Sequence, residues 1–263
     1  MPLALEGQEA LFERLAGRRP AVFLDYDGTL TGIVDRPEDA HLSSPMRQTI
    51  AALASRCPVA VISGRDRRDV AARVGLPELI YAGSHGFDIA GPHGTEIQYE
   101  AGGGFTATIE RAARELRYRL LGIDGVIVES KRYSVAVHYR LVAPGDRPQL
   151  VQVVEEVLAA HPDLRQTDGK MVFELRPALD WDKGRALEWL LRALGLDGPD
   201  VVPIYLGDDS TDEDAFRALA GRGIGILVAD APRATLAACR LRDPAEVEQW
   251  LQALVGRLAA PRG

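Results

Sequence analysis

Alternation between short apolar runs and amphipathic segments is the feature that most constrains the fold of this chain. Five runs are almost wholly apolar, and most of them lead into polar residues: Ala21–Asp25, Val59–Ser63, Leu79–Ala82, Val201–Gly207 and Ile224–Val228. Strands of a parallel sheet have this composition because helices cover both of its faces. The segments between and after the runs have helical periodicity: Pro45–Ser55, Asp66–Val74, Lys183–Leu194, Asp212–Leu219 and Pro244–Leu258. The sequence therefore predicts an α/β fold with a doubly wound, mainly parallel sheet.

Residues 105–177 interrupt this rhythm. The alternation of apolar and polar residues over Ser134–His138 is typical of an antiparallel sheet with one covered face. The segment contains two predicted helices and three predicted strands: Thr106–Leu121, Gln149–Ala160, Val126–Glu129, Tyr133–Arg140 and Met171–Arg176. Glycines at 102–104 and a proline at 177 flank it as candidate hinges. We therefore expect a smaller α+β domain, residues 105–177, inserted into a core of residues 1–104 and 178–263.

Charge and composition exclude several classes of partner. Lys and Arg total 31 and Asp and Glu total 38, a formal net charge of −7, which disfavours nonspecific binding to nucleic acid or to an anionic membrane. No apolar run approaches the ~18–20 residues that cross a bilayer, and the N-terminus has acidic residues where a signal peptide is basic. Cys57 and Cys239 lack metal-ligand spacing and are interpreted as buried apolar residues. We expect a cytoplasmic monomer whose partner is a small molecule.

Acidic residues gather at the ends of two predicted strands. Asp25 and Asp27 follow the first strand, and Asp208, Asp209, Asp212 and Glu213 follow a later one. In an open α/β sheet, ligands bind at the carboxyl ends of the strands. Acids crowded there repel one another unless a hard cation lies among them, and oxygen ligands suit Mg²⁺. A capping role for Asp212 on the following helix is the alternative. The pattern favours a shared Mg²⁺ site.

Two further segments supply positive potential at the same sheet edge. Ser63-Gly64-Arg65 ends the second predicted strand and precedes a helix, so its hydroxyl and the free N–H groups of the first turn form an anion site. Lys183 begins a later helix and is expected to direct its ammonium group to the same place. Carboxylates, a hydroxyl, a lysine and a metal site together indicate phosphoryl transfer.

These motifs resemble those of a known superfamily. Asp25-Tyr26-Asp27-Gly28-Thr29-Leu30, Ser63, Lys183 and the GDDSTDED segment at 207–214 resemble, in order, the four signature motifs of haloacid dehalogenase superfamily phosphatases. Further segments resemble trehalose-6-phosphate phosphatases in particular: SGR at 63–65, GSHG at 83–86, E-x-K at 129–131 and GKMVFELRP at 169–177. The resemblance implies a Rossmann-like core with an inserted cap domain, and hydrolysis of trehalose 6-phosphate to trehalose and phosphate.

The resemblance also implies a role for each catalytic residue. Asp25 would attack phosphorus to form an aspartyl-phosphate, and Asp27 would act as general acid and then as general base. Ser63 and Lys183 would hold the phosphoryl oxygens. The implied Mg²⁺ ligands are the Asp25 carboxylate, the Asp27 backbone carbonyl and Asp208. Asp209, with Asp212, would support the metal through water or through these ligands.

Substrate selection is expected to involve both predicted domains. The implied substrate-binding residues of the core are Gly64, Arg65, Ser84, His85 and Gly86, and those of the insert are Glu129, Lys131, Arg140, Lys170 and Glu174. Carboxylates can pair with sugar hydroxyls, and cations can hold a phosphate. His138 and Tyr139, in the same insert, are predicted to pack.

Three alternatives remain at the level of the sequence. A related phosphatase for sucrose phosphate or mannosyl-3-phosphoglycerate is the first, because a cap changes specificity more easily than the core changes chemistry. A phosphomutase is the second, and a silent sugar-phosphate sensor is the third. The presence of both Asp25 and Asp27 favours a hydrolase over a sensor, which needs neither a nucleophile nor a proton donor.

Overall fold

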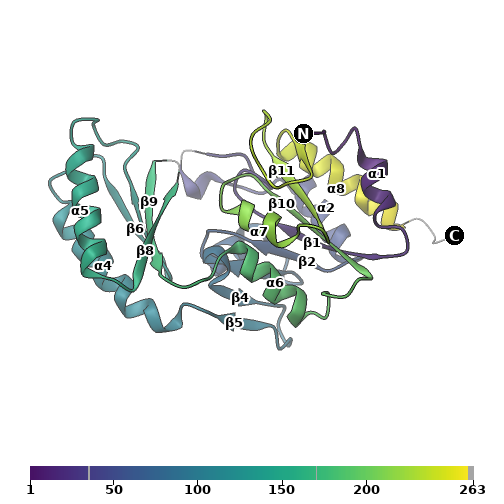
Figure 1. Cartoon of the computed structure of the whole chain (residues 1–263), viewed down its shortest axis with the longest axis horizontal. Coiled ribbons are helices and arrows are strands. Elements are labelled where there is room, and N and C mark those ends of the chain that lie inside the picture. Colours follow the sequence, from purple (N-terminus) through teal and green to yellow (C-terminus); the bar gives the residue numbers. More distant parts are fainter. Residues whose placement is uncertain (35, 170, 260–263) are drawn as a thin grey trace. The chain divides into compact units, whose positions relative to one another are not determined.

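The chain folds into two compact units, each with its own sheet (Figure 1). The computed structural model describes residues 1–34, 36–169 and 171–259. The first unit comprises Met1–Tyr99 and Trp181–Gly263, and the second comprises Glu100–Asp180. The expected insert at 105–177 lies within the second unit.

The sheet of the first unit is mainly parallel. Its strand order is β12-β11-β10-β1-β2-β3-β4-β5. The strands are β1 (Arg19–Leu24), β2 (Val59–Ile62), β3 (Ile80–Gly83), β4 (Asp88–Ala90), β5 (Gln98–Glu100), β10 (Val201–Gly207), β11 (Ile224–Val228) and β12 (Cys239–Leu241). β1 pairs in parallel with both β2 and β10, whereas β4 is antiparallel to β3. The chain leaves β1 toward β2 and returns later to β10 on the other side, so the strand order reverses beside β1, where open α/β sheets bind ligands.

Helices cover both faces of this sheet. One face carries α1 (Gln8–Glu13), α2 (Ser44–Ala54), α3 (Arg67–Val74) and α8 (Pro244–Ala259), and the other carries α6 (Lys183–Ala193) and α7 (Asp212–Ala218). Val22 and Leu24 of β1 face the first core, whereas Ala21 and Phe23 face the second. Burial on both faces accounts for the continuous apolar runs. The predicted α/β fold is confirmed, although β4, β5 and β12, each three residues long, were not predicted.

The second unit is an antiparallel sheet with helices on one face. Its strand order is β6-β7-β9-β8, with β6 (Ile127–Ser130), β7 (Val135–His138), β8 (Leu164–Gly169) and β9 (Val172–Pro177). The helices are α4 (Thr106–Arg119) and α5 (Arg147–Ala160). Val135, Val137 and Leu175 pack with residues of both helices to form the core of this unit. Strand β8 was not predicted, since its sequence, LRQTDG, has one apolar residue.

The described residues also form three single turns of 3-10 helix. They are η1 (Pro37–Asp39), η2 (Ser84–Gly86) and η3 (Gly103–Phe105). η2 directly follows β3, so it lies at the carboxyl end of the parallel sheet. This position puts the GSHG segment at the edge where the acidic residues were expected to gather.

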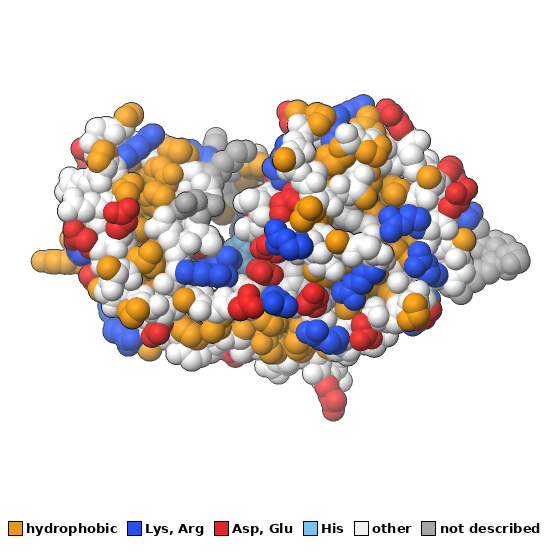
Figure 2. Space-filling model, viewed as in Figure 1, with side chains coloured by type: hydrophobic (Ala, Val, Ile, Leu, Met, Phe, Trp, Pro, Cys, Tyr) orange, Lys and Arg blue, Asp and Glu red, His pale blue; other side chains and the backbone are white. Residues whose placement is uncertain are grey.

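The surface carries interspersed charges. On the face drawn in Figure 2, Lys and Arg side chains lie among Asp and Glu rather than in one continuous basic area. Within the described ranges, no helix has both the length and the apolar character needed to cross a membrane.

Candidate active site

Asp25 and Lys183 form a buried ion pair at the end of β1. The backbone N–H of Asp25 donates to the carbonyl of Leu206 at 2.9 Å, which fixes Asp25 beside β10. Lys183 begins α6, where Asp182 caps the helix by accepting from the N–H of Arg185 at 2.8 Å. The Lys183 ammonium donates to Asp25 Oδ1 at 2.8 Å, and the two residues are only 3% and 4% exposed. The two residues predicted as nucleophile and phosphate-binding cation therefore lie in direct contact.

Asp212 anchors the loop that follows β10. Its Oδ1 accepts hydrogen bonds from Lys183 Nζ at 2.7 Å and from the Tyr205 hydroxyl at 2.6 Å. Its Oδ2 accepts from the backbone N–H groups of Asp208 and Asp209 at 2.9 and 3.0 Å. Asp212 is fully buried and links the lysine to the acidic loop. The sequence points to Asp212 as a helix cap or as a support of the metal, and it gives no signal for Tyr205, which resembles a core residue of its strand.

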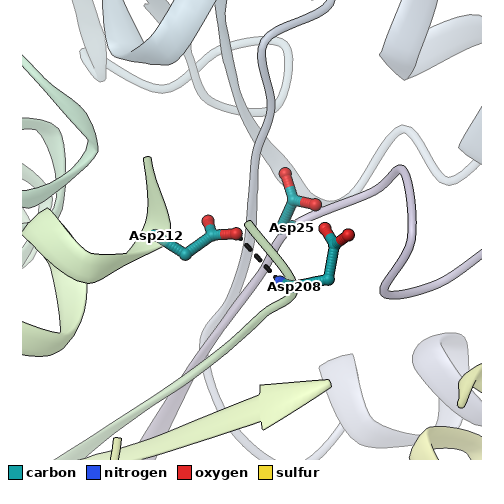
Figure 3. Close-up of side chains that lie close together, drawn as sticks. All are labelled: Asp25, Asp208 and Asp212. Atoms are coloured by element: carbon teal, nitrogen blue, oxygen red, sulfur yellow. Dashed lines mark hydrogen bonds between the residues drawn. The ribbon is translucent and has the colours of Figure 1, made fainter. Parts of the chain in front are cut away.

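Asp25, Asp208 and Asp212 form a carboxylate group suited to a divalent cation. One carboxylate oxygen from each lies within 4.8 Å of the others, where β1 and β10 end and α7 begins (Figure 3). Gly28 has a φ of +81°, and a Cβ at this position would overlap the Asp208 carboxylate. A glycine is therefore needed for the loop after β1 to approach Asp208 so closely. Oxygen donors in a compact group fit Mg²⁺.

Electrostatics of the group also favour a cation. Burial raises the pKa of Asp25 well above its usual value, and the neighbouring carboxylates Asp212 and Asp208 add to the effect of burial against the charge of Lys183. Burial, with Asp212 and Asp209 nearby, raises the pKa of Asp208 to about 7. Burial also raises the pKa of Asp212, despite Lys183. The single positive charge of Lys183 thus does not balance the charges of the carboxylates around it. A bound divalent cation would supply the missing positive charge.

Asp209 is not one of this group of three. Its Oδ1 accepts from the Thr211 N–H at 2.8 Å, from the Thr211 hydroxyl at 2.7 Å and from the Asp212 N–H at 3.3 Å. Burial opposes its ionisation, but the charge of Lys183 and the hydrogen bonds from Thr211 outweigh burial and lower its pKa. The carboxylate therefore stabilises the loop itself, and a role of Asp209 toward a metal stays a prediction.

Asp27 and Arg65 form a two-pronged ion pair next to the buried group. Arg65 Nε donates to Asp27 Oδ2 at 2.6 Å, and Arg65 Nη2 donates to Asp27 Oδ1 at 2.7 Å. The Asp27 side chain is 43% exposed, whereas that of Arg65 is 10% exposed. The predicted general acid/base is thus held by a residue that the sequence assigned to the substrate.

Segments after β2 and β3 lie side by side and bring the remaining core residues together. The His85 N–H donates to the Ser63 carbonyl at 2.9 Å, and the Ser84 N–H donates to the Arg65 carbonyl at 2.7 Å. Ser84 and His85 have φ of 50° and 58°, the left-handed conformation that non-glycine residues rarely adopt, and Gly86 follows with 91°. A Cβ on Gly64 would lie 2.9 Å from His85 Cε1, so Gly64 permits the imidazole to pack on the backbone.

In the second unit, two of the predicted substrate residues, Glu129 and Glu174, lie on the sheet face opposite to the helices, and a third, Lys131, contacts Glu174 there. Glu129 and Glu174 both align with Ala136 in the strand register. Lys131 Nζ and the Ser134 hydroxyl donate to Glu174 Oε1 at 3.0 and 2.7 Å. This face, the polar sheet face, also carries Arg165, Thr167 and Arg176, because their positions alternate with those of the core residues.

His138 belongs to this polar sheet face and not to the core. Its Nε2 lies 2.9 Å from Glu129 Oε2, a contact that lowers the pKa of Glu129 despite burial of the carboxyl group. The prediction that His138 packs is therefore wrong, whereas Tyr139 does pack, since its ring stacks on Phe173 at 4.7 Å between centroids. Arg140 follows β7 and is exposed. The predicted residue Lys170 lies outside the described residues.

Comparisons with known proteins agree with this geometry. The family model for trehalose-phosphatase matches residues 23–245. The chain is 42% identical to trehalose 6-phosphate phosphatase RA3 of Zea mays, over 98% of this chain and 76% of that protein. A crystal structure of a trehalose-6-phosphate phosphatase related protein superposes with a TM-score of 0.76 at 26% identity, over 90% of this chain and 97% of that one. A haloacid dehalogenase-like hydrolase from Bacteroides thetaiotaomicron shares the fold, with a TM-score of 0.66 at 17% identity, over 90% of this chain and 100% of that one. The chain is therefore an enzyme of the trehalose-phosphatase family, with a haloacid dehalogenase-like fold.

Proposed function

We propose that this enzyme hydrolyses trehalose 6-phosphate to trehalose and inorganic phosphate through a phosphoryl group carried by Asp25. The observation that carries the proposal is that Asp25, Lys183 and Asp212, which are buried, lie together with the partly buried Asp208 at the strand and helix ends of a chain that belongs to this family. Carboxylates and a lysine fixed in a buried position are what an in-line displacement at phosphorus requires.

The first step forms a bond between an Asp25 carboxylate oxygen and phosphorus and breaks the bond between phosphorus and the sugar oxygen. Lys183 holds Oδ1 of Asp25, so Oδ2 is the oxygen that we assign to attack. The proton that the departing sugar oxygen needs comes from Asp27, two residues further along the loop. Trehalose then leaves with this proton, and Asp27 remains as a carboxylate.

The second step hydrolyses the acyl phosphate. Asp27 takes a proton from water, the water oxygen bonds to phosphorus, and the bond between phosphorus and Asp25 breaks. This returns Asp25 as a carboxylate and Asp27 as an acid. Lys183 and Ser63, which follows β2 and is fully buried, would hold the other phosphoryl oxygens.

Mg²⁺ would be held by Asp25, Asp208 and the Asp27 backbone carbonyl, with Asp212 completing the carboxylate group and Asp209 supporting the loop. When bound, it supplies the positive charge that allows an anionic phosphate to approach several carboxylates. The shortage of positive charge around Asp25 and Asp208 supports this assignment.

The substrate assignment is tested by phosphate release from a panel of trehalose 6-phosphate, sucrose 6-phosphate, glucose 6-phosphate and mannosyl-3-phosphoglycerate. We expect Mg²⁺-dependent turnover with a marked preference for trehalose 6-phosphate. Preference for another member of the panel would keep the chemistry and replace the substrate. Binding of trehalose 6-phosphate without turnover would instead identify a sensor.

Selection of the sugar is assigned to the polar sheet face of the second unit. Glu174 is the best candidate to pair with sugar hydroxyls, because Lys131 and Ser134 already hold its Oε1 in one orientation. A carboxylate fixed in this way can accept from a hydroxyl without losing further side-chain freedom.

Replacement of Glu174 by Ala should therefore discriminate between substrates. We expect kcat/KM for trehalose 6-phosphate to fall by about 10–100-fold, whereas that for 4-nitrophenyl phosphate, which has no sugar, changes by less than about threefold. Glu110→Ala is the matched control, since Glu110 is exposed on α4 of the same unit. Equal losses on both substrates would remove Glu174 from sugar recognition.

A further inference from the structure

Arg65 is held by more groups than a substrate-binding arginine needs. Besides its two bonds to Asp27, its Nη1 donates to Asp69 Oδ2 at 3.0 Å and its Nη2 donates to the Pro37 carbonyl at 2.8 Å. Its guanidinium carbon lies 5.4 Å from the centroid of the Tyr26 ring, over the ring face. A guanidinium has five N–H donors. Four of the five are therefore engaged by protein acceptors.

The anchor of Arg65 does not depend on Asp27. Asp69, in α3, is itself held by Arg73, whose Nε lies 2.9 Å from both of its carboxylate oxygens. The hydrogen bonds from Arg73 and Arg65 outweigh burial and lower the pKa of Asp69, so it remains an anion beside the guanidinium. Arg65 is thus fixed from one side by Asp69, Pro37 and Tyr26, and presents Nε and Nη2 to Asp27 from the other.

Asp27 is more exposed than Arg65. Its side chain is 43% exposed and lies in the turn after β1, where a carboxylate without a partner would sample several rotamers in water. The paired donors of Arg65 select one of them, because a guanidinium fork fits both oxygens of a carboxylate in one plane. Each oxygen keeps a second lone pair for a water molecule or a substrate oxygen.

We propose that Arg65 is a positioning residue for Asp27 and not a ligand of the substrate. The inference rests on the proposed function, in which Asp27 gives a proton to the sugar oxygen and later takes one from water. Arg65 holds the carboxyl group in one orientation for both transfers. Loss of Arg65 should therefore slow the steps in which Asp27 moves a proton and spare those in which it does not.

4-Nitrophenyl phosphate separates these steps. Its leaving group departs as a stable anion that needs no proton, so transfer of the phosphoryl group to Asp25 does not require Asp27. Hydrolysis of the acyl phosphate still requires Asp27 as a base. For Arg65→Gln, we expect a burst of about one nitrophenolate per chain, and then a steady rate about 10²-fold below that of the unaltered enzyme.

The same variant should respond differently to the two substrates in kcat/KM. For trehalose 6-phosphate, kcat/KM should fall by about 10²-fold, within the range of general acid catalysis, whereas for 4-nitrophenyl phosphate it should stay within about threefold. An arginine that holds the phosphoryl group would lower both values together. An arginine that binds the sugar would lower only the value for trehalose 6-phosphate and would give no burst with 4-nitrophenyl phosphate. Equal losses in kcat/KM on the two substrates, or the absence of the burst, would therefore overturn the proposal.

Two further variants keep the test decisive. Arg19→Ala removes an exposed arginine that pairs with Asp200 at the surface, and it should leave the ratio of the two kcat/KM values unchanged. Arg65→Lys keeps the charge but not the fork, so restoration of full activity by lysine would overturn the proposal, as would a burst shared by Arg19→Ala. Thermal unfolding followed by circular dichroism identifies any variant that fails to fold, and Arg65→Lys then replaces Arg65→Gln in the assay.

Asp27→Asn distinguishes failure of this inference from failure of the proposed function. If Asp27→Asn gives the burst and Arg65→Gln does not, the mechanism stands and Arg65 has no positioning role. If Asp27→Asn gives no burst and equal losses on both substrates, Asp27 is not the acid and base, and the proposed mechanism fails with the inference.

Discussion

Replacement of Asp25 by Asn should abolish the release of phosphate from trehalose 6-phosphate, by more than about 10³-fold in kcat, while the protein still folds. The amide has nearly the shape of the carboxylate but lacks its nucleophilic oxygen. Lys183 keeps Asp212 as an anionic partner at 2.7 Å, so its ammonium group is not left buried without a counter-ion. Activity should be measured as phosphate release in the presence of Mg²⁺.

The direction in which Asp25→Asn changes the stability of the folded protein can also be predicted. Burial raises the pKa of Asp25, which means that the folded protein disfavours its charged form. A neutral Asn avoids this cost, and we expect the variant without Mg²⁺ to unfold at a temperature equal to or above that of the unaltered enzyme. Asp200→Asn, at an exposed ion pair with Arg19, is the control that should leave activity unchanged. Activity of Asp25→Asn above a few per cent would contradict a covalent mechanism.

The central sheet could be predicted because the apolar composition of its strands indicates that they are buried. Strands β1, β2, β10 and β11 are apolar on both sides, and helices such as α6 begin at a recognisable cap, Asp182. Strand β8 could not be predicted, because it lies at an edge of a sheet with one open face and its polar residues read as a loop. The sequence thus indicates which segments are buried. A strand with few buried residues gives no such indication and cannot be predicted.

The candidate site could be predicted as a set of residues but not as a set of contacts. Asp25, Ser63, Lys183 and Asp208 stand at strand or helix ends that the sequence places at one sheet edge. The choice between Asp209 and Asp212 depends on which carboxylate turns toward Lys183 and Tyr205, and those residues lie in other segments of the chain. Which side chains contact one another depends on the tertiary structure, and the spacing of residues along the sequence does not determine it.

The same limit explains Arg65 and His138. Arg65 was assigned to the substrate through the resemblance of its SGR motif, and His138 was predicted to pack. The structure pairs Arg65 with Asp27, 38 positions earlier, and His138 with Glu129 on the adjacent strand. A long cationic or titratable side chain has several possible partners within reach, so its role follows from what surrounds it.

Acidic groups crowded at the strand ends also determine how the protein should respond to metal. Without Mg²⁺, Asp208 in the folded protein keeps its proton up to a pH near its raised pKa of about 7, whereas the unfolded chain releases it near pH ~4. Between these values the folded state binds more protons than the unfolded state, so stability is lost as the pH rises. A divalent cation held by Asp25, Asp208 and Asp212 would compensate this charge, and its stabilising effect should grow over the same pH window.

Removal of Mg²⁺ with EDTA should therefore abolish turnover and lower the unfolding temperature, more at pH 7.5 than at pH ~5. At a Mg²⁺ concentration about 100 times the dissociation constant, binding to the folded state contributes about 2.7 kcal/mol, or roughly 5–10 °C in a protein of this size. The measurement is thermal unfolding with and without Mg²⁺ at both pH values, beside phosphate release. Asp208→Asn should lose most of the Mg²⁺-induced rise, whereas Asp200→Asn should keep it, because Asp200 pairs with Arg19 on the surface. A rise that is independent of pH and survives in Asp208→Asn would place the cation elsewhere, since Asp25, Asp208 and Asp212 are the one group of acidic side chains, within the described part of the chain, that lie close enough together to hold a metal ion.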